Sequence, residues 1–164
     1  MREYLIPAPF VQIDAGVSEE SRRLSTWLAS VRRESSRSVV LGWRDELKAE
    51  IADVYRSRTS PDWDGHGANP MSPATLQAAL HFASMLPDSL IEPDIVPEPS
   101  GTISLEWRVD RNNIFSVEMA NDALVYAGLL DSKVRKHGQE PFTSSIPEGI
   151  ASILASHFRK EELD

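Results

Sequence analysis

The feature that most limits the fold of this chain is a change in the spacing of its apolar residues after Gly101. From there apolar and polar residues alternate, so that Ile103, Leu105 and Trp107 point one way while the residues between them point the other. A period of two is typical of strands with one covered face. Short polar breaks separate successive runs, which predicts a meander of three or four antiparallel strands at about 102–109, 113–119, 123–130 and 132–137.

Apolar residues recur at helical spacing elsewhere in the chain. This pattern predicts helices at about 18–34, 39–58, 72–86 and 147–160. Ser72 and Pro73 form a typical helix start, with a capping hydroxyl before a proline. The prolines between 87 and 100 allow at most an edge strand there. Helices grouped around a run of strands indicate the α+β class, with the helices packed on one face of the sheet.

The length of 164 residues suits one domain. Pro7 and Pro9 favour an extended arm over 1–17, which leaves 18–164 as a single α+β domain. The chain has no cysteine, which excludes disulfides and thiolate metal sites. Its first residues lack the pattern of a signal peptide, and no stretch has the length of apolar sequence that a membrane span needs. We therefore expect a cytoplasmic protein without membrane contact.

Charge is distributed unevenly along the sequence. The chain has 17 Lys and Arg against 25 Asp and Glu, a net charge of −8, which argues against direct nucleic-acid binding. Residues 59–107 contain no Lys or Arg and seven carboxylates: Asp62, Asp64, Asp88, Glu92, Asp94, Glu98 and Glu106. Such a segment indicates either a solvated surface or a patch that attracts a basic protein.

The densest cluster of polar residues is the loop from Asp62 to Gly67. Its alternating acids and glycine resemble the start of a calcium loop, but His66 is a poor calcium ligand and Pro73 stands where a closing glutamate is needed. The alternative interpretation is structural. Trp63 is then an anchor, Asp64 bonds backbone amides, and Gly65 and Gly67 supply positive φ angles.

A second pattern is a Pro-Asp step at Asp94 followed by Glu106-Trp107-Arg108 across a glycine turn. In outline it resembles the metal-binding hairpin of restriction-type nucleases, in which an Asp and a Glu hold magnesium. Arg108 stands where such a hairpin has lysine, and arginine stays protonated. A metal-dependent nuclease or hydrolase using Asp94 and Glu106, with Asp64 or His66 nearby, is therefore an alternative function. The sequence contains no nucleophile elbow and no phosphate-binding glycine motif, so we expect no catalytic set, metal or cofactor.

The segments WDGHGANPMSP and GTISLEWR together resemble a family of small uncharacterised bacterial proteins. That family has a Trp-Asp-Gly-x-Gly-Ala-x-Pro loop before a helix and Leu-Glu-Trp on a strand, and the resemblance covers about residues 61–130. It implies a bacterial, cytoplasmic protein and transfers no activity. The pattern often has an aromatic residue at the position of His66, which weakens a metal or catalytic role for that histidine.

The leading hypothesis from the sequence is a non-enzymatic interaction protein that binds a basic partner. In its most specific form it is antitoxin-like and neutralises a basic toxin encoded nearby. The acidic residues expected to contact the partner are Asp62, Asp64, Glu98, Glu106 and Glu118. Two alternatives stay open: the metal-dependent enzyme described above, and a structural domain that self-associates, for example as a homodimer.

Overall fold

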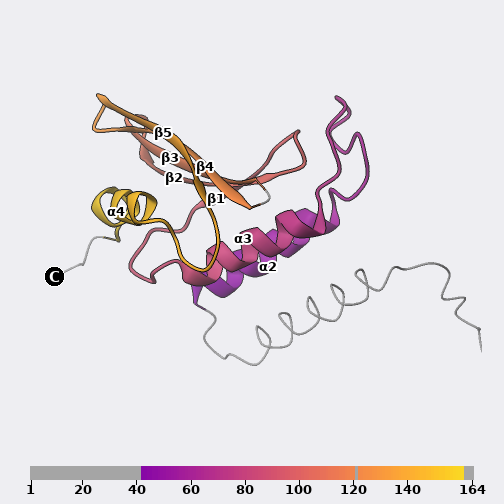
Figure 1. Cartoon of the computed structure of the whole chain (residues 1–164), viewed down its shortest axis with the longest axis horizontal. Helices are drawn as coiled ribbons and strands as arrows, with labels where there is room; N and C mark the ends of the chain where they lie inside the picture. Colours follow the sequence, from indigo (N-terminus) through magenta and orange to yellow (C-terminus); the bar gives the residue numbers. More distant parts are fainter. Residues whose placement is uncertain (1–41, 121, 161–164) are drawn as a thin grey trace, which may run out of the picture.

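The chain folds into a five-stranded antiparallel sheet with helices on one side, shown in Figure 1. This computed structural model describes residues 42–120 and 122–160. The helices are α2 (Trp43–Arg56), α3 (Pro73–Met85) and α4 (Glu148–His157), and the strands are β1 (Asp94–Pro97), β2 (Ile103–Asp110), β3 (Asn113–Ala120), β4 (Ala123–Leu130) and β5 (Val134–Pro141). The predicted α+β class is confirmed.

The sheet has one strand more than the three or four predicted. Its order is β1-β2-β3-β4-β5, with every neighbouring pair antiparallel. The additional strand is β1, which pairs with β2 so that Ile95 lies opposite Leu105 and Pro97 opposite Ile103. A proline is tolerated there because β1 is an edge strand.

The last strand lies further along the chain than predicted. It was expected at 132–137 and is found at Val134–Pro141. The shift arises because Asp131 and Ser132 adopt positive φ angles of 51° and 63° and form the turn instead. Gly138, expected to end the strand, lies within it. The position suits glycine, since a Cβ there would come 2.5 Å from the Tyr126 hydroxyl oxygen.

The three described helices match predicted ones, with shorter ends. Ser72 caps α3, since its Oγ accepts a hydrogen bond from the Thr75 N–H at 3.0 Å. Helix α4 ends at His157 and not at 160, because the next residues pair with the 89–91 segment through a bridge between Leu90 and Arg159. The predicted arm 1–17 and helix 18–34 lie outside the described residues.

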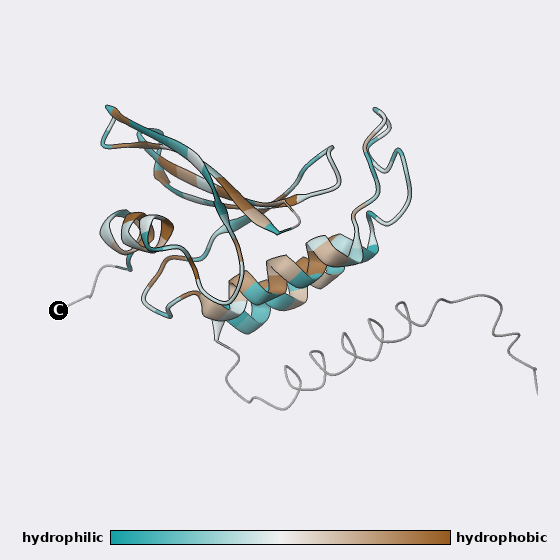
Figure 2. Cartoon of the chain, viewed as in Figure 1, coloured by the Kyte–Doolittle hydropathy of each residue, from teal (hydrophilic) through white to brown (hydrophobic). Residues whose placement is uncertain are grey.

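The core lies between the sheet and α3, and α2 packs on the far side of α3 (Figures 1 and 2). Phe82 of α3 meets Trp107 of β2 edge to face, with ring centroids 6.4 Å apart. Phe158, just after α4, stacks on Phe115 of β3 at 6.3 Å. The Trp107 indole N–H donates to the Ile91 carbonyl at 3.1 Å, so this fully buried ring leaves no unpaired donor.

Candidate functional site

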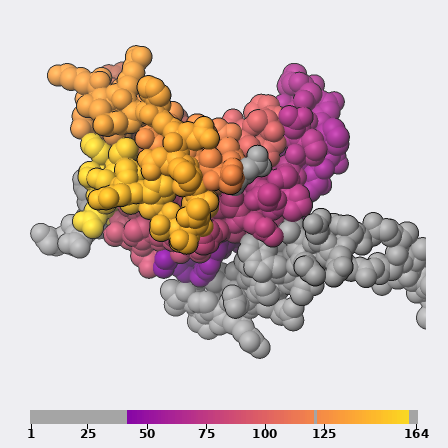
Figure 3. Space-filling view, viewed as in Figure 1, coloured from indigo at the N-terminus to yellow at the C-terminus, as the bar shows by residue number. Residues whose placement is uncertain are grey.

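Carboxylates gather on the side of β1, β2 and β3 that faces away from the helices. The strand register places Asp94 directly opposite Glu106, and Ser104 directly opposite Glu118. Glu98 follows β1 and its side chain reaches Ser104 on this same side. We call Asp94, Glu98, Glu106 and Glu118 the acidic face. None of the described helices covers it (Figure 1), and in Figure 3 the molecular outline dips between the β4–β5 hairpin and the loop before α3.

Hydroxyl groups orient two carboxylates of the acidic face. The Ser104 hydroxyl donates to Glu98 Oε1 at 2.9 Å, and the Thr102 hydroxyl donates to Glu118 Oε1 at 2.5 Å. Ser104 itself is only 2% exposed, so its hydroxyl depends on Glu98 for a hydrogen-bond partner. These bonds hold the side chains in place while leaving further oxygen lone pairs for a ligand.

One cation borders the acidic face. Arg108 Nη2 donates to Glu106 Oε1 at 2.6 Å, and the two side chains are 51% and 24% exposed. Because Arg108 is half exposed, this ion pair is screened by water and neutralises Glu106 only in part. Asp94, on the other side of Glu106, is exposed and has no ion pair within the described residues.

The carboxylates of the 62–67 loop bond their own backbone. Asp62 has a φ of 58°, and its Oδ1 accepts the Gly67 N–H at 2.7 Å. Asp64 Oδ1 accepts the N–H groups of His66 at 2.8 Å and Ala68 at 3.1 Å. Gly65 and Gly67 have φ angles of 73° and 89°, in the left-handed region that favours glycine. This is the geometry of a self-bonded turn.

These backbone bonds affect the acidity of Asp64. The His66 N–H, and after it the Ala68 N–H, stabilise the carboxylate and hold the pKa of Asp64 below its ordinary value of 3.8. Trp63 anchors the loop, since its indole N–H donates to the Asn69 carbonyl at 2.8 Å and the Arg58 guanidinium lies 5.0 Å from the centroid of its ring.

The loop is joined to the turn that carries Glu98. The Asn69 N–H donates to the Pro99 carbonyl at 2.8 Å, and Gly101 in the same turn lies against Pro70. Asp62 and Asp64 therefore belong to a loop beside the acidic face, with their carboxylates engaged locally. Of the five residues expected to contact a partner, Glu98, Glu106 and Glu118 are brought together by the sheet, and the two in this loop are not part of that group.

The acidic segment 59–107 does not form a single patch. Asp88 follows α3 and pairs with Arg44 of α2 at 2.7 Å, and its carbonyl accepts the Trp43 indole N–H at 3.3 Å. These contacts belong to the helical layer. The acidic face thus combines three carboxylates of the segment with Glu118, which lies beyond it in the sequence.

Asp94 and Glu106 form a pair and no larger group of metal ligands. Within 42–120 and 122–160, no three or more His, Asp or Glu side chains are arranged to hold a metal ion. Asp64 and His66, considered as additional ligands, belong to the loop before α3. The pair can place two oxygens on one ion, with Arg108 beside it.

Sequence reasoning did not include Asp94 among the partner contacts. A signal was available in the hairpin turn around Ser100, because residues equally spaced on either side of it pair across β1 and β2. Counting outward from this residue places Asp94 opposite Glu106. The hydroxyls of Thr102 and Ser104 were missed as well, because their bonds to Glu118 and Glu98 depend on how three strands meet.

Comparison with known proteins gives no relative. The chain matches no protein-family model, no curated protein and no solved structure. In the part of the chain that the structure describes, no helix combines the length and the apolar character needed to cross a bilayer.

Proposed function

We propose that this protein is a non-enzymatic interaction module that binds a basic protein through the acidic face. The observation that supports the proposal is the gathering of Asp94, Glu98, Glu106 and Glu118 on one side of the sheet that no described helix covers. Hydrogen bonds from the hydroxyls of Thr102 and Ser104 hold two of these carboxylates at fixed positions. Carboxylates held in position attract and orient a cationic surface, and they repel acidic proteins that compete for it.

The partner in this proposal presents Lys or Arg at strand spacing. Asp94 and Glu106 belong to one row across the strands, and Glu118 lies in the next row beside Ser104. A guanidinium can bridge two carboxylates, since it has five donors in a planar fork. Arg108 then orients Glu106 and does not contact the cationic partner.

The specific form of the proposal is an antitoxin-like protein of the bacterial cytoplasm that neutralises a basic toxin encoded beside it. A neutralising protein needs a rigid complementary surface and no catalytic group of its own. A chain without cysteine suits a reducing compartment. The product of a small basic reading frame adjacent to the gene is the first partner to test.

The test compares two triple variants with equal net charge. Asp94→Asn, Glu106→Gln and Glu118→Gln together remove three charges from the acidic face. Glu46→Gln, Glu50→Gln and Glu148→Gln together remove three from exposed positions on α2 and α4. Binding of the purified neighbouring product is measured by calorimetry at low and moderate salt. We expect the first variant to lose about tenfold or more in affinity and the second to change less than about twofold. Equal effects of the two variants, or no binding of any stoichiometric partner at low salt, would contradict the proposal.

A metal-dependent hydrolase or nuclease is the second candidate, favoured by the direct cross-strand pairing of Asp94 with Glu106. Arg108 donates to Glu106 at 2.6 Å but cannot deprotonate to activate water. Calorimetric titration with magnesium, manganese and zinc separates the two candidates. Micromolar binding that Glu106→Ala abolishes would favour the enzyme and displace the interaction module.

A further inference from the structure

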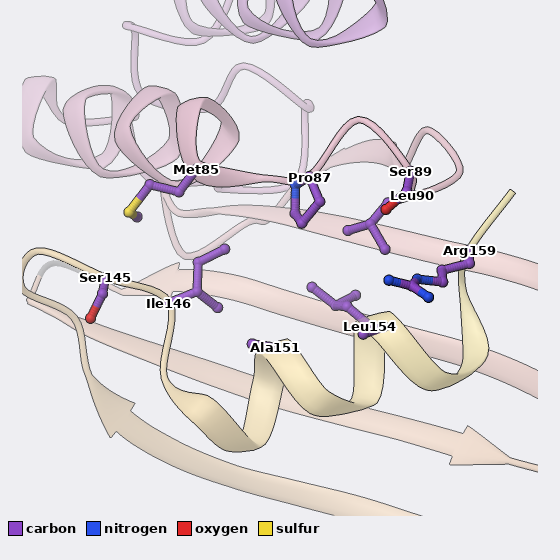
Figure 4. A pocket seen from close by; sticks show the side chains of 10 residues that line it. Met85, Pro87, Ser89, Leu90, Ser145, Ile146, Ala151, Leu154 and Arg159 are labelled. Atoms are coloured by element: carbon purple, nitrogen blue, oxygen red, sulfur yellow. The ribbon is translucent and has the colours of Figure 1, made fainter.

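A cavity of about 310 Å³ lies between the end of α3 and α4, away from the acidic face. Seven of its ten lining residues are apolar, and the other three are Ser89, Ser145 and Arg159. Figure 4 shows Ile146, Ala151 and Leu154 along the α4 side, and Met85, Pro87 and Leu90 along the α3 side. This volume is at the lower end of the range for small-molecule sites, and a mainly apolar lining with few polar groups is characteristic of them.

The two walls of the cavity are fixed by backbone hydrogen bonds. The Ile91 N–H donates to the Phe158 carbonyl at 2.9 Å, and the Lys160 N–H donates to the Ser89 carbonyl at 2.7 Å. Together with the bridge between Leu90 and Arg159, these bonds tie the chain after α4 to the segment after α3. The cavity is therefore preformed, which lowers the entropic cost of binding a ligand.

Short side chains keep the cavity open. Ala151 and Ala155 are separated by one helical turn, so they share the face of α4 that lines the space. Both are exposed, and neither fills the volume that a Leu would occupy at the same position. Because about 310 Å³ of space lies between apolar walls, a ligand with an apolar body would bury surface there.

Arg159 gives the cavity its charge. Its side chain lies between Leu90 and Leu154 in Figure 4, and it is the only charged residue among the ten that line the space. Within the described residues its guanidinium has neither a hydrogen bond nor an ion pair. A guanidinium offers two parallel donors that match a carboxylate and disfavours an organic cation.

We propose that this cavity binds a small organic acid, whose aliphatic or aromatic body fills the apolar space and whose carboxylate pairs with Arg159. The proposal does not depend on the acidic face or on a protein partner. It commits to a monocarboxylate because the cavity contains one cation at its edge and is otherwise apolar.

The test is a titration of the full-length protein with octanoate, followed by amide chemical shifts in nuclear magnetic resonance spectra. Octanol, with the same chain and no charge, is the matched probe. We expect saturable shifts at Ser89, Ala151 and Ala155, with a dissociation constant of about a millimolar or tighter for octanoate. Octanol should bind about five to tenfold more weakly.

Two pairs of variants separate the charge from the cavity. Arg159→Gln should reduce octanoate binding to the level of octanol, whereas Lys160→Gln, which removes the same charge beside the cavity, should leave the preference for octanoate unchanged. Ala155→Leu should weaken both ligands by about tenfold by filling the space, and Ser156→Leu on the neighbouring position of α4 should not.

Three results would overturn the proposal. The first is the absence of saturable shifts with octanoate. The second is equal loss of binding in Arg159→Gln and Lys160→Gln, which would indicate a general charge effect. The third is octanoate shifts that spread away from the cavity. Light scattering of the same sample checks for a second copy on the cavity, which would appear as a dimer and would occupy the place assigned to the ligand.

Discussion

At the scale of single residues, backbone conformation constrains the molecule most tightly where the loop before α3 meets the β1–β2 turn. Gly101 has a φ of 86°, and a Cβ there would come 2.7 Å from the Pro70 carbonyl oxygen. Gly67 has a similar φ of 89° but faces open space. The two glycines therefore separate the cost of an unusual backbone angle from the cost of a steric clash.

Alanine at these two glycines should have unequal effects. Gly67→Ala is expected to lower the free energy of unfolding by about 1–2 kcal/mol, the cost of a left-handed conformation for a residue with a Cβ. Gly101→Ala should cost at least about 1 kcal/mol more, because the Pro70 carbonyl must also move. Urea denaturation of both variants measures the difference, and equal losses would mean that the close approach of Gly101 to Pro70 has no energetic weight.

Lowering the pH should reduce the free energy of unfolding through protonation of Asp64 in the 62–67 loop. Its pKa is lower in the folded protein than the ordinary value of 3.8, because the His66 N–H bonds the carboxylate. On acidification the unfolded chain therefore takes up this proton first. The contribution of the Asp64 charge to stability is complete above about pH 5, and it is lost as the pH falls through 3.8 and below.

Urea unfolding of the wild type and Asp64→Asn at a series of pH values checks the direction in which the Asp64 contribution to stability changes with pH. The stability difference between them should be constant near neutral pH and shrink below pH 4. Glu46→Gln, at an exposed position in α2, is the control. A difference between wild type and Asp64→Asn that grows with acidification would contradict the assignment.

At the scale of elements, the sequence predicted those strands whose signals are local. Alternation from Ile103 to Leu130 is enough to specify β2, β3 and β4, since each strand pairs with the next through a short turn. Strand β1 was harder to predict because four residues with a terminal proline show little periodicity. The docking of Asn69 on Pro99 was not predictable, because it depends on how α3 brings two distant segments together.

Strand β5 forms one edge of the sheet and is protected by charge. Arg135 and Lys136 are exposed on opposite faces of the strand, and Val134 beside them is 44% exposed. Cations on an edge strand discourage pairing with a second copy, because like charges would then lie close together. The homodimer considered from the sequence has to overcome this repulsion if it forms through β5.

Removing those charges should promote self-association. We expect the double variant Arg135→Thr and Lys136→Thr to form dimers or larger species at concentrations where the wild type does not, since threonine favours strands and adds no repulsion. Size-exclusion chromatography with light scattering measures this. Arg111→Thr and Lys160→Thr together remove two positive charges at exposed positions outside β5, and they control for the change in charge and composition. A double variant that stays as monodisperse as wild type would show that β5 is protected by something else.

At the scale of the whole molecule, charge is separated along the sheet. The backbone of Ser132 bonds the Asn112 carbonyl at 3.3 Å, which brings the β2–β3 and β4–β5 turns together. Arg111 and Lys133 lie in these two turns, at the opposite end of β2 from the turn that carries Glu98. Asp110 and Asp131 flank the same two turns and offset these cations, whereas the turn that carries Glu98 has no Lys or Arg. The net charge of −8 would therefore draw a basic partner toward the Glu98 end of the sheet before contact.

The sequence indicates a segment rich in carboxylates, but not how much their mutual repulsion lowers the free energy of unfolding. A substitution at Asp94 measures this effect. Asp94 lies directly opposite Glu106, and like charges in opposite positions of neighbouring strands destabilise a sheet. Asp94→Asn should therefore raise the free energy of unfolding by about 0.2–1 kcal/mol at low salt while it weakens binding of the basic partner.

Urea denaturation at low and high salt tests the expected gain in the free energy of unfolding. The gain from Asp94→Asn should shrink as salt screens the repulsion between the exposed Asp94 and the partly buried Glu106. Asp88→Asn is the matched control and should lower stability slightly, because Asp88 pairs with Arg44 at 2.7 Å. If Asp94→Asn instead destabilised the domain, the carboxylate would be needed by the fold itself. Stabilisation by Asp94→Asn would mean that the sheet keeps two opposed charges at a cost to its own stability, which a binding role explains and a folding role does not.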